Sequence, residues 1–123
     1  MIIFIACSCG SDSKKHVIPE KDDNNDKIEE GQEKLKYLAL GDSYTIGESV
    51  DPSMRYPVQI ADSLEKRGCL MEDPRIVAVT GWTTGDLKAG IKTANPQGPY
   101  DLVSLLIGVN NQYRGMDINI YRK

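Results

Sequence analysis

The chain has 123 residues, of which 40% are hydrophobic and 27% are charged, and its formal net charge is −3. This length accommodates one domain rather than two. The acidic balance and the lack of a basic stripe argue against a nucleic-acid-binding protein, and three cysteines imply no disulfide framework.

The first nine residues begin with a short apolar stretch, residues 2–6, whereas a membrane span needs roughly 20 apolar residues. An apolar segment that ends at a small residue before a cysteine is typical of the end of a secretory signal. Residues 4–7, Phe-Ile-Ala-Cys, resemble the lipobox of bacterial lipoproteins, and Cys7 or Cys9 would carry the lipid. We therefore predict that residues 1–9 are the remnant of a lipoprotein signal peptide. The alternative is a weakly packed N-terminus.

A polar segment follows, over residues 10–34, and it is dense in Lys, Asp, Glu, Asn and Ser. It cannot bury enough apolar surface to offset an ordering cost of about 1 to 2 kcal/mol per residue. We predict a flexible tether that leads to a globular domain over residues 35–123. A lipid anchor and this tether together would place the domain outside the cytoplasm, on the periplasmic or outer-membrane face.

The domain is predicted to begin with a buried strand over residues 35–40, because this stretch is almost continuously apolar. Residues 45–55 lack a helical period and are expected to form a loop. A helix is predicted from Tyr56, with Pro57 in its first turn and Gly68 just past its end. Its inward face is expected to carry Ile60, Ala61 and Leu64.

A second strand is predicted over residues 75–79, and Thr83 or Thr84 can cap a second helix that reaches about Thr93. Leu87 and Ile91 are four residues apart and should face inward. A third strand is predicted over residues 100–108. A polar loop is expected after Asn110 and Asn111, and Asp117 can cap a final helix.

Alternation of strands and helices with short links predicts parallel βαβ units and a flavodoxin-like three-layer α/β/α sandwich. In such a sheet the carboxyl ends of all strands line one edge, where ligands bind. Ser43, Gly81 and Asn110 each follow a predicted strand, so we expect them to meet at this edge. Ester cleavage needs a nucleophile and donors to the oxyanion. Ser43 can supply its hydroxyl as the nucleophile, and its own N–H, the Gly81 N–H and the Asn110 side-chain amide can be the donors.

The three segments resemble sequence blocks of the SGNH, or GDSL-type, hydrolases. Residues 36–43, Lys-Tyr-Leu-Ala-Leu-Gly-Asp-Ser, resemble the first block, and the resemblance implies that Ser43 is the nucleophile. Residues 80–83 resemble the second block, in which Gly81 donates its N–H to the oxyanion. Residues 107–111 resemble the third, in which Asn110 is the other donor, with Asn111 at the position of the usual aspartate. The resemblance covers residues 35–123 and implies an esterase or lipase with this three-layer fold.

The family also uses an Asp-x-x-His pair as the base that activates its serine. The one histidine of this chain, His16, lies in the predicted tether, and we read it as a solvated tail residue. We expect that the chain is the N-terminal part of a longer hydrolase and is nearly inactive by itself.

The substrate remains open among a lysophospholipid, another acyl ester and an acetylated glycan. Tyr44, Trp82 and Tyr113 are either an aromatic rim that binds substrate or residues that pack in the core and loops. No cofactor and no metal are expected. Two other functions stay open: a non-catalytic, glycan-binding surface lipoprotein, and a flavin- or nucleotide-binding module. For the second, residues 43–47 bear only a faint resemblance to a phosphate-binding loop.

Overall fold

The computed structural model describes residues 33–121. The predicted signal remnant and nearly all of the predicted tether lie outside the described residues, as do Cys7, Cys9 and His16. The elements in chain order are β1 (Tyr37–Gly41), α1 (Ser43–Ile46), the 3-10 helix η1 (Pro52–Met54), α2 (Tyr56–Glu65), β2 (Arg75–Ala78), α3 (Thr84–Ala94), β3 (Leu102–Leu106), α4 (Val109–Tyr113) and α5 (Ile118–Tyr121).

The described strands form one parallel sheet in the order β2-β1-β3. In the register of this sheet, Gly41 at the end of β1 lies opposite Ala78 of β2 and Leu106 of β3. All three strands therefore end at the same edge, with β1 in the centre where the strand order reverses. Such a switch point is where open parallel sheets bind ligands.

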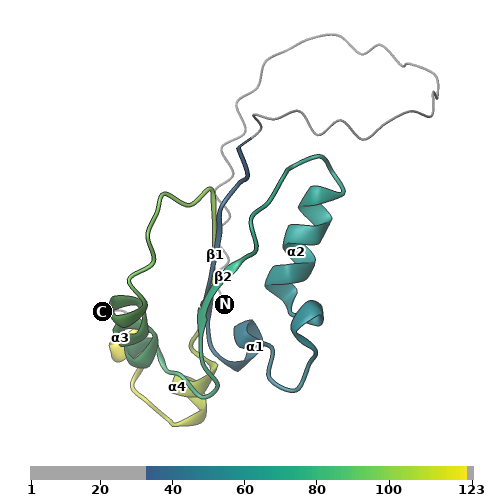
Figure 1. The fold of residues 1–123 in the computed structure, drawn as a ribbon. Helices are drawn as coiled ribbons and strands as arrows, with labels where there is room; N and C mark the ends of the chain where they lie inside the picture. The colour runs from purple at the N-terminus through teal and green to yellow at the C-terminus, as the bar shows by residue number, and fades with distance from the viewer. Residues whose placement is uncertain (1–32, 122–123) are drawn as a thin grey trace, which may run out of the picture.

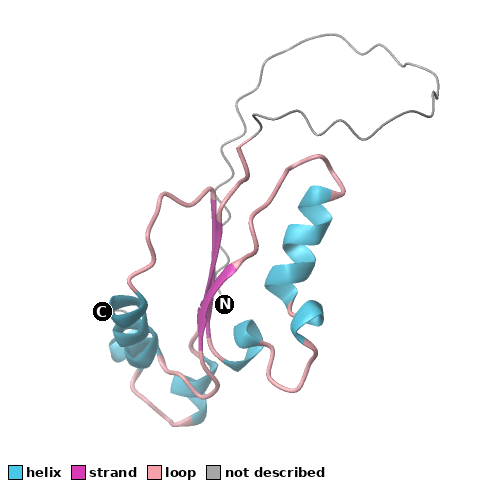
Figure 2. Cartoon of the chain, in the orientation of Figure 1, coloured by secondary structure: helices cyan, strands magenta, loops and turns pink. Residues whose placement is uncertain are grey.

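Helices cover both faces of the sheet, with α2 on one side and α3 on the other (Figures 1 and 2). Alternate residues of β1 point to opposite faces. Tyr37 and Ala39 pack with Ala61 of α2, whereas Leu38 packs with Leu87 of α3. The predicted three-layer α/β/α architecture with a parallel sheet is confirmed.

The helix faces agree with the sequence pattern except at one position. Leu87 is buried and Ile91 packs beside it, as predicted, and Ala61 and Leu64 contact the core on the other face. Ile60 was expected to share the face of Ala61, but it is 37% exposed. Successive helix residues are separated by about 100°, so Ile60 lies at the margin of the face that Ala61 and Leu64 present.

The described part of the chain contains three short helices that the sequence pattern did not predict. α1 overlaps the start of the expected loop of residues 45–55, η1 lies within that loop, and α4 occupies the expected polar loop after β3. Helices of three to five residues have no room for an apolar period, so the pattern does not report them. The strands are also shorter than predicted at one or both ends.

Candidate active site

Ser43 is the first residue of α1, directly after the turn that ends β1. Asp42 is buried and caps this helix, because its Oδ1 accepts a hydrogen bond from the Tyr44 N–H at 3.2 Å. At the other end Gly47 has a left-handed φ of 71° and donates its N–H to the Ser43 carbonyl at 3.0 Å. Hydrogen bonds among residues 42–47 alone thus fix both ends of the helix that begins with Ser43.

Gly41 allows α1 to approach the sheet closely. A Cβ atom at this position would lie 2.0 Å from Thr45 Oγ1 and 2.5 Å from the Leu106 carbonyl oxygen, distances that no side chain could tolerate. Thr45 is completely buried, and its hydroxyl lies 3.3 Å from the Tyr56 hydroxyl. The glycine before Asp42 and Ser43 is therefore required by packing, whatever chemistry Ser43 performs.

Asn110 lies in α4, which begins after Gly108, a residue with φ of 119°. Its Nδ2 donates to the Trp82 carbonyl at 2.9 Å and lies 3.5 Å from Asp42 Oδ2. Asp42 adjoins Ser43 in the chain and Trp82 adjoins Gly81. The structure therefore brings the Asn110 amide to both of the segments that carry the other predicted site residues, as the strand-end argument expected.

Gly81 lies in the β2–α3 loop with φ of 81°, and Arg114 Nη2 donates to its carbonyl at 2.8 Å. Its own N–H has no acceptor among residues 33–121, and the same holds for the Ser43 N–H. Both backbone donors are therefore available to a ligand. Nothing in the sequence pattern pointed to Arg114, because the contact joins residues 33 positions apart.

Asn111, next to Asn110, is buried and fixes the start of α3. Its Oδ1 accepts from the Thr84 N–H at 2.9 Å, and its Nδ2 donates to the Thr84 hydroxyl at 2.9 Å. α4 and its C-cap residue Arg114 thus hold the β2–α3 loop and the start of α3 through three side chains: Asn110, Asn111 and Arg114.

Thr83, one of the two predicted caps, is the N-cap of α3. It forms a capping box with Asp86, in which each residue's side chain accepts a hydrogen bond from the other's backbone N–H. The Thr83 backbone N–H and hydroxyl donate to Asp86 Oδ2 at 2.9 and 2.7 Å. These bonds hold the pKa of Asp86 below its usual value.

The described residues contain the predicted nucleophile without the predicted base. Ser43 is partly exposed, and residues 33–121 include no histidine. The neighbouring Asp42 carboxylate is buried and engaged as the helix cap. Within the described range no group of His, Cys, Asp and Glu side chains could hold a metal ion.

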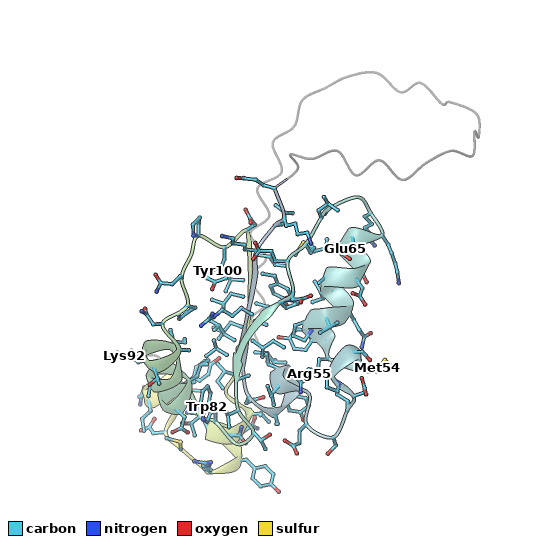
Figure 3. All side chains as sticks on the ribbon, in the orientation of Figure 1. Met54, Arg55, Glu65, Trp82, Lys92 and Tyr100 are labelled. Carbon is cyan, nitrogen blue, oxygen red and sulfur yellow. The ribbon has the colours of Figure 1, made fainter. Side chains whose placement is uncertain are left out.

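The three aromatic residues behave differently. Tyr44 is 63% exposed and lines a pocket beside Ser43, and Tyr113 is 92% exposed. Trp82 packs against the core cluster of Leu38 and Leu87, and its ring covers Gly90 of α3; Figure 3 labels it between α3 and the sheet. For Trp82 the structure favours the packing alternative, whereas Tyr44 and Tyr113 remain available for substrate.

The pocket beside Ser43 has a volume of about 410 Å³ and opens to solvent. Its wall comes from α1, η1 and the start of α2, with the end of β3. Most of its lining is apolar, from Val50, Met54, Tyr56 and Leu106, and its charged residues are Glu48 and Arg55. The sequence does not predict this pocket, because residues 45–55 lack a helical period and a loop has no surface that a pattern defines.

Comparison with known proteins places this geometry in a family. The model of the GDSL-like lipase/acylhydrolase family matches residues 39–123. The solved structure of AlinE4, an SGNH-hydrolase family esterase, is similar with a TM-score of 0.66 and 27% sequence identity, and the match covers 74% of this chain and 49% of AlinE4.

Two AlinE4 variants, one with a serine and one with an aspartate replaced by alanine, match with TM-scores of 0.62 and identities of 27% and 28%. Each match again covers 74% of this chain and 49% of the other, so the chain spans about half the length of these relatives. No curated protein sequence matches significantly. The chain belongs to the GDSL-like lipase/acylhydrolase family.

Proposed function

We propose that the chain supplies the nucleophile and the oxyanion donors of an enzyme that hydrolyses carboxylic esters. The observation that carries this proposal is the position of Asn110 Nδ2, which lies 2.9 Å from the Trp82 carbonyl and 3.5 Å from Asp42 Oδ2. It supports a site in which Ser43, Gly81 and Asn110 surround one carbonyl group.

In this mechanism the Ser43 hydroxyl oxygen attacks the ester carbonyl carbon and gives its proton to a base. The carbonyl oxygen becomes negative, and the N–H groups of Ser43 and Gly81 donate to it. Asn110 Nδ2 also donates to it, in exchange for its long 3.5 Å bond to Asp42 Oδ2. The tetrahedral intermediate expels the alcohol and leaves an acyl group on Ser43. Water then attacks this acyl group and releases the carboxylic acid.

The base is proposed to come from outside residues 33–121, because these residues contain no histidine. The family resemblance implies an Asp-x-x-His pair for this role, which the 123-residue chain lacks. We therefore propose that this chain alone hydrolyses esters very slowly and that the product of the complete gene does so efficiently.

The apolar wall of the pocket beside Ser43 suits the hydrocarbon part of an ester. Lysophospholipids, other acyl esters and acetylated glycans remain the proposed substrates. An anchor at Cys7 or Cys9 would bring the enzyme to such substrates outside the cytoplasm. Both cysteines lie outside the described residues, and no helix within residues 33–121 is long and apolar enough to cross a membrane.

The proposal is tested by labelling Ser43. A fluorophosphonate should react with the complete gene product at Ser43, and Ser43→Ala should abolish both labelling and hydrolysis of 4-nitrophenyl pentanoate. Ser63→Ala is the matched control, because Ser63 is an exposed serine of α2 whose hydroxyl donates to the Gln59 carbonyl. Hydrolysis that persists in Ser43→Ala would refute the proposal. Glycan binding without labelling would favour a non-catalytic lipoprotein, and a bound flavin would favour the nucleotide-binding alternative.

A further inference from the structure

Arg55 brings a positive charge to the pocket beside Ser43. Both residues line this pocket, whose remaining wall is largely apolar. Figure 3 labels Arg55 next to Met54, where η1 leads into α2. The stem of the side chain lies on Gly47, because a Cβ atom at Gly47 would come within 2.6 Å of Arg55 Cγ. Arg55 is thus held against the same short helix that carries Ser43.

The Arg55 guanidinium has no acceptor within the described part of the chain. Its Nε is buried without a hydrogen-bond partner, and no carboxylate of residues 33–121 lies within the 4.0 Å of an ion pair. A guanidinium has five N–H donors and is always charged. Because buried polar groups in folded proteins are almost always paired, such a group calls for an explanation.

The carboxylates nearest in sequence are engaged elsewhere. Glu48, which also lines the pocket, accepts a hydrogen bond from the Thr80 hydroxyl. Asp51 Oδ1 accepts from the Ser53 N–H and hydroxyl at 2.9 and 2.6 Å. These bonds are the main reason that the pKa of Asp51 lies below its usual value, and Arg55 is the smallest contributor to that shift. Neither carboxylate forms an ion pair with Arg55, so the guanidinium keeps N–H donors for a ligand.

We propose that Arg55 binds an anionic group, a carboxylate or a phosphate, on the ester that Ser43 attacks. This inference rests on the proposed function, since it describes the substrate of the same site. A guanidinium forms short, charge-assisted and often bidentate hydrogen bonds with such groups. The apolar residues beside it would contact the hydrocarbon part of the ester. The favoured substrate is thus an ester with an apolar segment and one negative charge.

A binding experiment tests the charge preference without hydrolysis. The 123-residue chain is titrated by NMR with monomethyl glutarate, propyl phosphate and neutral methyl pentanoate, which has the same chain length as the glutarate ester. We expect at least one of the two anions, the carboxylate or the phosphate, to bind about tenfold more tightly than methyl pentanoate. Its binding should also shift the Arg55 side-chain signal. Equal affinity for the neutral and both anionic compounds would overturn the proposal.

Variants separate the charge from the packing of the side chain. Arg55→Met keeps an apolar stem on Gly47 and should remove the preference for the anion, whereas Arg55→Lys should keep part of it. Glu48→Gln removes the negative charge from the same pocket, so it should strengthen anion binding slightly. An Arg55→Met variant that retains the preference would contradict the role of Arg55, and its thermal unfolding checks that it is folded.

Hydrolysis by the complete gene product distinguishes the two levels of the proposal. The ratio of kcat/KM for 4-nitrophenyl hydrogen glutarate to that for 4-nitrophenyl pentanoate should fall about tenfold in Arg55→Met. Loss of both activities in Ser43→Ala with an unchanged ratio in Arg55→Met would reject the anion site and keep the esterase. Activity that survives Ser43→Ala would reject the proposed function itself.

Discussion

The two loops that carry backbone donors are held in different ways. The segment of Ser43 is fixed by its own neighbours, through the Asp42 cap and the Gly47 turn. The β2–α3 loop with Gly81 is fixed by side chains of α4 that are about 30 residues away in sequence. One half of the site is therefore encoded locally, and the other half depends on the packing of a later element.

The largest effect is expected when the local half is broken at Gly41. Gly41→Ala places a Cβ atom 2.0 Å from Thr45 Oγ1, so α1 must move away from the sheet. We expect a loss of about 3 kcal/mol in the free energy of unfolding. Urea denaturation of the 123-residue chain measures it.

Gly85→Ala is the matched control for this substitution. Its Cβ would be no closer than 3.8 Å to Thr83 Oγ1, and Gly85 lies within α3. Alanine is the better helix former by about 0.8 to 1 kcal/mol, so this variant should be at least as stable as the wild type. Equal destabilisation by both substitutions would show that the contact at Gly41 is not what matters.

A smaller loss is expected when α4 releases the distant loop at Asn111. Asn111→Ala leaves the partly buried Thr84 N–H without its acceptor, which should cost about 2 kcal/mol. Asn111→Asp keeps that acceptor, and the Thr84 hydroxyl can turn to donate to the carboxylate. It should therefore be much less destabilising in the same denaturation experiment. If the aspartate variant were as unstable as the alanine variant, the bonds to Thr84 would not explain the role of Asn111.

Arg114 offers a way to disturb the Gly81 loop while leaving stability nearly unchanged. Arg114 is exposed, so Arg114→Met should alter the free energy of unfolding by less than about 0.5 kcal/mol. Loss of the 2.8 Å bond to the Gly81 carbonyl should nevertheless shift the amide signals of Gly81 and Trp82 in ¹H–¹⁵N spectra. The Ser43 amide should not move. A shift at Ser43 as large as that at Gly81 would contradict the separation of the two halves.

The smallest effect concerns Asp86, which belongs to the cap of the helix after the Gly81 loop. Its pKa is lowered in the folded state by bonds from Thr83, so the carboxylate stabilises the fold at pH values above its ordinary pKa of about 3.9. That contribution should disappear as the pH falls through the lower, folded-state pKa. The difference in stability between wild type and Asp86→Asn should therefore be constant near neutral pH and vanish in acid. A gap that persists in strong acid would mean that the cap does not depend on the charge.

The difference between the halves also explains what the sequence predicted. The strand that ends before Ser43 and the cap at Thr83 are short-range patterns, and both were expected. The parallel order of the strands followed from the alternation of strand and helix. The positions of Ser43, Gly81 and Asn110 at one edge followed from that order.

The rest could not be predicted, because it depends on contacts between distant residues. The packing of Trp82 on Gly90 is set by how α3 lies on the sheet. The bond from Arg114 to Gly81 requires the position of α4, a helix too short to show a period. The place of Arg55 in the pocket depends on how the chain folds back over Gly47.

The rate of ester hydrolysis by Asn110→Ala tests the central claim most directly. If Ser43, Gly81 and Asn110 surround one carbonyl group, this variant of the complete gene product should lose about 10²- to 10³-fold in kcat for 4-nitrophenyl pentanoate. The variant should still be labelled by a fluorophosphonate at Ser43. A kcat within about twofold of the wild type would contradict the account.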